Sequence, residues 1–193
     1  MLRLNNRDSL WVGLALGLVM AATRGQHAAV LGHPLPDASL AVFFLAGVYL
    51  RPAWVFAALF LDGMLIDIAA VTWGGVSGFC ISPAYVFLVP AHAALWAAGR
   101  WYAGHHSYRV ATLLPLAAAV FGAAVAAELL ASGSFYLFSG RFEDLSLAEL
   151  ISRLLRYFPS SLEALAFYTG IAALVHVGFV LTREIGKPRR TPE

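Results

Sequence analysis

Long apolar runs, separated by short polar segments or by glycine and proline, fill most of the chain. Six runs can be distinguished, at residues 10–29, 38–50, 52–71, 83–101, 108–131 and 162–182. A helix needs about 20 apolar residues to cross the hydrocarbon core of a bilayer, with about 17 as the lower limit. The pattern therefore predicts an all-α integral membrane protein in which six transmembrane helices form a single domain over residues 1–193.

The second run is short on this scale. It ends at Arg51 and Pro52, where the proline forces a break before the third run begins. In the alternative, this run forms part of a re-entrant pair, and every later helix then has the opposite orientation.

A further helix is expected between the fifth and sixth spans, near residues 146–158. Its apolar residues recur at helical spacing, which predicts an amphipathic helix on the outer surface or folded over the mouth of the bundle. Ser146, with Glu149 three residues later, forms a capping box that starts this helix. Ser160 and Glu163 repeat the pattern, so the sixth span is expected to start separately there.

Composition agrees with a membrane location. Hydrophobic residues make up 60% of the chain and charged residues 12%, whereas a soluble domain has about 25% charged residues. The first charged stretch does not resemble a cleaved signal peptide, because further spans follow it. A basic run suited to nucleic acid is not found before the last few residues, so nucleic-acid binding is not expected.

The basic residues orient the six spans. One side receives nine of the 13 lysines and arginines and the other side four, so the positive-inside rule makes the first side cytoplasmic. Both termini are then cytoplasmic, and segments 24–37, 72–82 and 132–158 face outward. The nine are Arg3, Arg7, Arg51, Arg100, Arg109, Arg183, Lys187, Arg189 and Arg190, and the four are Arg24, Arg141, Arg153 and Arg156.

Cys80 lies in the second outer segment, within the glycine-rich stretch 73–83. Because it is the sole cysteine, an internal disulfide and a CxxC cluster are excluded. Two interpretations remain, a small packed side chain or a soft thiolate offered to a metal or another reactive group. A reactive thiol would need a base, and His27 on the first outer segment is a candidate.

Carboxylates inside membrane spans are costly and tend to be functional. Asp62 and Asp67 lie five residues apart on the third span, about 140° around the helix, and so do not share a face. Asp67 is expected to face an outward cavity, and Asp62 to pair within the bundle with His92 or His176. Glu128 is expected at the outer interface of the fifth span.

Other polar residues are expected near the outer cavity. Arg24 and His27 interrupt the outer end of the first span, which suggests a wet surrounding. Tyr85 follows Cys80 by five residues and adds an aromatic hydroxyl beside the thiol. Arg153 on the amphipathic helix is a candidate ligand contact, and its pairing with Glu149 one turn earlier is the alternative.

The first span has small residues at every fourth position, Gly13, Gly17 and Ala21 among them. In lipid, such a stripe allows another helix to approach closely. The helix that approaches can belong to this chain or to a partner protein, and the sequence leaves both open.

The stretch Gly74–Cys80 and the arrangement of six spans resemble the BtuM family, S-component-like proteins of Gram-negative bacteria related to energy-coupling-factor vitamin transporters. The resemblance implies uptake of cobalamin (vitamin B12) across the inner membrane, with the Cys80 loop on the periplasmic side. It implies that Cys80 is an axial ligand of the corrinoid cobalt, with thiol-assisted removal of an upper ligand such as cyanide. His27, Asp67, Tyr85 and Arg153 are the expected contacts to the corrinoid.

In S components the stripe on the first helix contacts a coupling subunit that works with two ATPases, which implies a docking face at Gly13, Gly17 and Ala21. The chain has no nucleotide-binding motif of its own. Two other functions remain open, a membrane-embedded thiol or haem-handling protein that uses Cys80 with His27, and an assembly subunit without a ligand.

Overall fold

The computed structural model describes residues 6–24, 29–30, 33–143 and 145–185. The regular elements in this part of the chain are helices, apart from two antiparallel strands of two residues each, β1 (Ala29–Val30) and β2 (His33–Pro34), which confirms the all-α prediction. The α-helices are α1 (Asn6–Thr23), α2 (Ser39–Tyr49), α3 (Trp54–Thr72), α4 (Leu88–His105), α5 (Leu113–Phe138) and α6 (Leu147–Ile185). Short 3₁₀ helices η1 (Gly78–Cys80), η2 (Pro83–Phe87) and η3 (Val110–Thr112) connect them.

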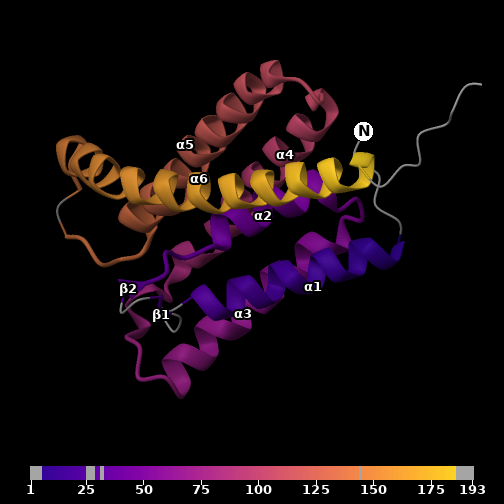
Figure 1. Cartoon of the computed structure of the whole chain (residues 1–193). Helices are drawn as coiled ribbons and strands as arrows, with labels where there is room; N and C mark the ends of the chain where they lie inside the picture. The colour runs from indigo at the N-terminus through magenta and orange to yellow at the C-terminus, as the bar shows by residue number, and fades with distance from the viewer. Residues whose placement is uncertain (1–5, 25–28, 31–32, 144, 186–193) are drawn as a thin grey trace, which may run out of the picture.

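The helices run back and forth between two ends of the bundle (Figure 1). At one end, Arg24 after α1 meets Asp67 near the end of α3 and Tyr85 before α4. We call this the Cys80 end. At the other, Arg100 near the end of α4 donates to the carbonyl oxygen of Arg51 between α2 and α3. This is the His106 end, and α1 begins and α6 finishes there.

Three helical segments are long and apolar enough to cross a membrane, namely Trp54–Thr72, Val110–Phe138 and Leu147–Thr182. Helix α2 is apolar but has 11 residues, a length of about 16 Å at 1.5 Å per residue. It runs through the middle of the bundle, and nine of its residues are buried. Because other helices surround α2, its length is set by its neighbours rather than by the thickness of a bilayer.

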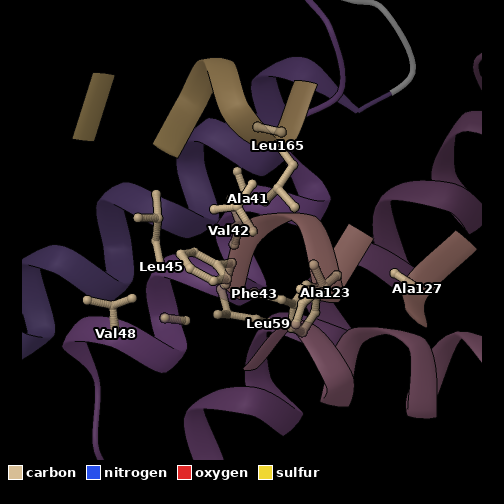
Figure 2. Packing of buried hydrophobic residues seen from close by; sticks show 14 of the residues in the cluster. Ala41, Val42, Phe43, Leu45, Val48, Leu59, Ala123, Ala127 and Leu165 are labelled. Carbon is tan, nitrogen blue, oxygen red and sulfur yellow. The ribbon is translucent and has the colours of Figure 1, made fainter. Parts of the chain in front are cut away.

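The core forms around α2. Figure 2 shows Val42, Phe43 and Leu45 of α2 among side chains from the helices on either side, such as Leu165 of α6 and Ala123 of α5. Phe43 is 1% exposed, and its ring contacts Phe56 of α3 and His92 of α4. This packing joins helices that are distant in the sequence.

Helices α2 and α4 approach each other so closely that only glycine fits at the contact. A Cβ atom on Gly47 would overlap the carbonyl oxygen of Trp96, and one on Gly99 would overlap that of Phe44. Close helix packing was expected at the stripe on α1, and this pair of glycines was not predicted.

The prediction of two separate helices after residue 146 is wrong. Ser146 does cap a helix, because its Oγ accepts a hydrogen bond of 3.1 Å from the backbone N–H of Glu149. The helix then continues through Pro159 to Ile185 as one element of 39 residues. Proline is tolerated inside an apolar helix where hydroxyls and neighbouring helices satisfy the freed backbone groups. Ser160 donates instead to the Tyr157 carbonyl oxygen and caps no new helix.

Candidate functional site

A bidentate ion pair joins α1 to α3 at the Cys80 end. Nε of Arg24 lies 2.6 Å from Oδ1 of Asp67, and Nη2 lies 2.7 Å from Oδ2. The two side chains are 15% and 25% exposed. Paired, charge-assisted hydrogen bonds of this kind are stronger than neutral ones and fix the orientation of both groups.

Three further residues extend this network. The Tyr85 hydroxyl donates to Oδ2 of Asp67 at 2.8 Å, so two of the predicted site residues lie together. Nη1 of Arg24 donates to the Ser39 hydroxyl at 2.7 Å, and this hydroxyl donates to Asp37. The network therefore connects α1, α2, α3 and η2. The pairing of Arg24 with Asp67 could have been inferred from two opposite charges near the same end of apolar helices, since such charges rarely remain unpaired.

The loop that carries Cys80 follows α3 and contains η1. Gly75 has a φ angle of +66°, a conformation that favours glycine, and the Ser77 hydroxyl accepts a hydrogen bond from the Phe79 N–H. Of Cys80, the structure describes the backbone, at the end of η1. Its side chain lies outside the described part of the chain, as does His27, the predicted base.

Aromatic contacts hold this loop against α5 and the segment before α6. The Phe79 ring lies 5.6 Å from that of Phe135, which lies 6.0 Å from that of Phe142. The guanidinium carbon of Arg141 lies 5.0 Å from the centre of the Phe79 ring. A cation over an aromatic face contributes about 0.5–1 kcal/mol at an exposed position.

Arg153 lies at the same end but outside the Arg24–Asp67 network. Its Nε bonds to Glu149 at 3.0 Å, which is the alternative that the sequence left open. Its guanidinium also lies 4.2 Å from the centre of the Phe142 ring. Arg153 thus reaches the Cys80 loop through a chain of aromatic rings, in which Phe142, Phe135 and Phe79 follow one another.

The space beneath the Arg24–Asp67 ion pair is small. A cavity of about 10 Å³ lies between Arg24, Tyr85 and His92, which is room for one water molecule at most. Arg24 and Tyr85 both bond to the Asp67 carboxylate, and the outward cavity that was expected beside Asp67 stays a prediction.

The expected pairing of Asp62 within the bundle is wrong. Asp62 pairs with neither His92 nor His176; its Oδ2 is buried without a hydrogen-bond partner among the described residues. His92 instead bonds through Nδ1 to the carbonyl oxygen of Leu88, while Asp62 lines a groove beside α1. Glu128 is 7% exposed and accepts hydrogen bonds from Ser132 and Ser161 between α5 and α6. Its place at the outer interface of the membrane stays a prediction.

The groove beside α1 has a volume of about 780 Å³ and lies between α1 and α3. All three residues of the predicted docking face, Gly13, Gly17 and Ala21, line it. Side chains from α3 form the other wall, with Asp62 among them. The small residues of α1 are thus not fully covered by the chain's own helices.

Among the described residues, no group of three or more His, Cys, Asp or Glu side chains lies close enough to hold a metal ion. A single sulfur ligand to a metal already bound in a macrocycle needs no such group. A scan against models of protein families finds no match for this chain, and a search of curated proteins finds no relative.

Proposed function

We propose that this chain captures a corrinoid of the vitamin B12 type at its Cys80 end and carries it across the bacterial inner membrane, as the resemblance to the BtuM family implies. The Cys80 thiolate binds cobalt at one axial position of the corrin ring, because a soft sulfur ligand competes well for a transition metal. The two other functions, a haem-handling protein and an assembly subunit without a ligand, are alternative outcomes of the test below.

The observation that carries this proposal is the gathering of polar side chains at the Cys80 end. Asp67 and Tyr85 bond to each other, and Arg24 and Arg153 lie at the same end. The rim of a corrin ring carries amides, which both donate and accept hydrogen bonds. A carboxylate, a hydroxyl and two guanidiniums suit such a rim, and the Phe79 and Phe142 rings suit its apolar parts.

Entry of so large a molecule requires the Cys80 end to open, because the present cavity holds one water at most. The Cys80 loop is the segment suited to this movement. Phe79 and Trp73 are 48% and 84% exposed, and the aromatic contacts of Phe79 fasten it from one side. The corrinoid then takes the space between this loop and the Asp67–Tyr85 pair.

When the vitamin arrives with cyanide on cobalt, the proposed chemistry is ligand exchange without a change of oxidation state. The thiolate forms a cobalt–sulfur bond, the cobalt–carbon bond breaks, and cyanide leaves with the bonding electron pair.

The membrane orientation forms part of the proposal. The helical bundle crosses the inner membrane, with the Cys80 end toward the periplasm and both termini in the cytoplasm. The three apolar segments and the excess of basic residues at the His106 end support this orientation. The α1–α3 groove, with Gly13, Gly17 and Ala21, accepts a coupling subunit that works with ATPases.

The deciding experiment is the visible spectrum of the purified protein after growth with cobalamin. We expect a bound corrinoid with a spectrum shifted from that of the free vitamin, and we expect Cys80→Ala to abolish this shift. Ser77→Ala, in the same loop, is the matched control and should keep it. An unchanged bound spectrum in Cys80→Ala would refute cobalt ligation, a Soret band would indicate haem, and a colourless protein would favour an assembly subunit.

A further inference from the structure

Two imidazole rings meet at the His106 end, far from the Cys80 loop. His106 lies directly after α4 and His176 lies on α6, and their ring centres are 5.8 Å apart with the planes at 90°. Both Nε2 atoms are buried, and neither has a hydrogen-bond partner among the described residues. A buried polar atom without a partner costs about 1–3 kcal/mol, so two of them side by side call for an explanation.

Tyrosines fix the orientation of both rings. Nδ1 of His106 lies 2.9 Å from the Tyr102 hydroxyl, which leaves Nε2 as its available nitrogen. The Tyr108 ring contacts His106 edge-on at 5.1 Å and lies parallel to the His176 ring at 6.3 Å. Tyr49 from α2 approaches His176 from 5.9 Å. Histidines that bind metals commonly have their second nitrogen held in this way.

The spacing of the rings suits one shared metal ion. With metal–nitrogen bonds of about 2.0–2.1 Å, two imidazoles on one ion place their ring centres roughly 5–6.5 Å apart, depending on the angle at the metal. The observed 5.8 Å falls within this range.

We propose that His106 and His176 bind one late first-row divalent metal ion through their Nε2 atoms. Imidazole nitrogens suit nickel, copper and zinc, and copper(II) binds most tightly in the general order of stability. Because the pair is not joined by a third His, Cys, Asp or Glu in the described part of the chain, the other positions on the ion are open to water or to an added ligand. Calcium and magnesium are disfavoured, since they prefer oxygen ligands.

His105 provides a matched control one residue away. Its Nδ1 lies 2.8 Å from the carbonyl oxygen of Trp101, and its ring rests against the Trp101 ring at 4.4 Å. It is exposed, so it represents the weak binding that any surface histidine gives.

The test uses the full chain, purified in detergent through a tag without histidines and stripped with a chelator. Copper(II) is added, and binding is followed by electron paramagnetic resonance. We expect one equivalent to bind with splitting from two nitrogens, His105→Gln to leave this signal unchanged, and His106→Gln or His176→Gln to remove it. Tyr102→Phe should weaken binding by about 10–100-fold, because Tyr102 positions a ligand.

Wild-type protein that binds no saturable equivalent of copper would overturn the proposal. So would a loss in His105→Gln as large as that in His106→Gln. If a variant fails to fold, the wild-type nitrogen splitting still decides the matter. The outcome is independent of cobalamin binding, which the Cys80 spectrum tests separately.

Discussion

Two helix pairs in this bundle carry glycines along their facing sides, and they use them in opposite ways. Between α2 and α4, Gly47 and Gly99 allow backbone to touch backbone, with no room for a methyl group. Between α1 and α3, a Cβ on Gly13 would meet its nearest atom, in Leu50, at 3.7 Å, and one on Gly17 would lie 3.6 Å from Asp62. The first contact is closed, and the second is an open groove.

The difference shows which interaction holds each pair of helices together. Direct packing joins α2 to α4, and both helices contribute buried residues along their lengths. At the Cys80 end, the Arg24–Asp67 ion pair joins α1 to α3 and leaves the groove below it. Small residues therefore serve the fold in one pair and remain available to a partner in the other.

The largest effect should come from closing the space between α2 and α4. We expect Gly99→Ala to lower the free energy of unfolding by about 3 kcal/mol, because its methyl group must push the Phe44 backbone away. Unfolding in a titration with dodecyl sulfate, followed by circular dichroism, measures this loss. Gly104→Ala, on the same helix with no atom within 4 Å, is the control. Equal stability of the two variants would contradict the closed contact.

A smaller effect should follow from removing the bridge between α1 and α3. Asp67→Asn leaves the Arg24 guanidinium without its counter-charge. Removing one partner of a fully buried pair costs about 3–5 kcal/mol, so we expect about 1–3 kcal/mol for this partly exposed one.

The same unfolding titration checks this value, with Glu149→Gln as the matched control. That substitution breaks a more exposed pair, Arg153–Glu149, and should cost no more than about 0.5 kcal/mol. If Asp67→Asn proves no more costly than Glu149→Gln, the ion pair does not hold α1 in place.

The sequence predicted the helices well where a single physical signal decided the outcome. Apolar runs located all six helices, and the Ser146 cap located the start of α6. The separate start of the sixth span at Ser160 was predicted wrongly, because a capping pattern is a local signal. The packing of α6 against α5 and α2, which local sequence cannot reveal, keeps the helix continuous. The glycine contact between α2 and α4 was missed for the same reason, since it depends on the register of two helices.

Within the candidate site, the sequence predicted the end of the molecule at which each residue lies better than it predicted the contacts between the side chains. It assigned Asp67, Tyr85 and Arg153 to one end, and the structure has all three there. It did not predict that Arg24 would occupy the space beside Asp67, because a span assignment gives the depth of a residue and not the direction of its side chain. The partner of Asp62 was predicted wrongly because the angular position of α3 relative to α4 was unknown.

The smallest effect on stability, and the sharpest test of the open groove, should come from Gly13→Leu. The added side chain enters a groove of about 780 Å³, so we expect the free energy of unfolding to change by less than about 0.5 kcal/mol. If the groove accepts a coupling subunit, this variant should still bind cobalamin when purified but should fail to support corrinoid-dependent growth of an uptake-deficient bacterium. Gly122→Leu on α5, where a Cβ would meet no atom within 4 Å, is the control and should support growth. Normal growth with Gly13→Leu would show that the groove is not a docking site, and the open side of the α1–α3 pair would then face lipid alone.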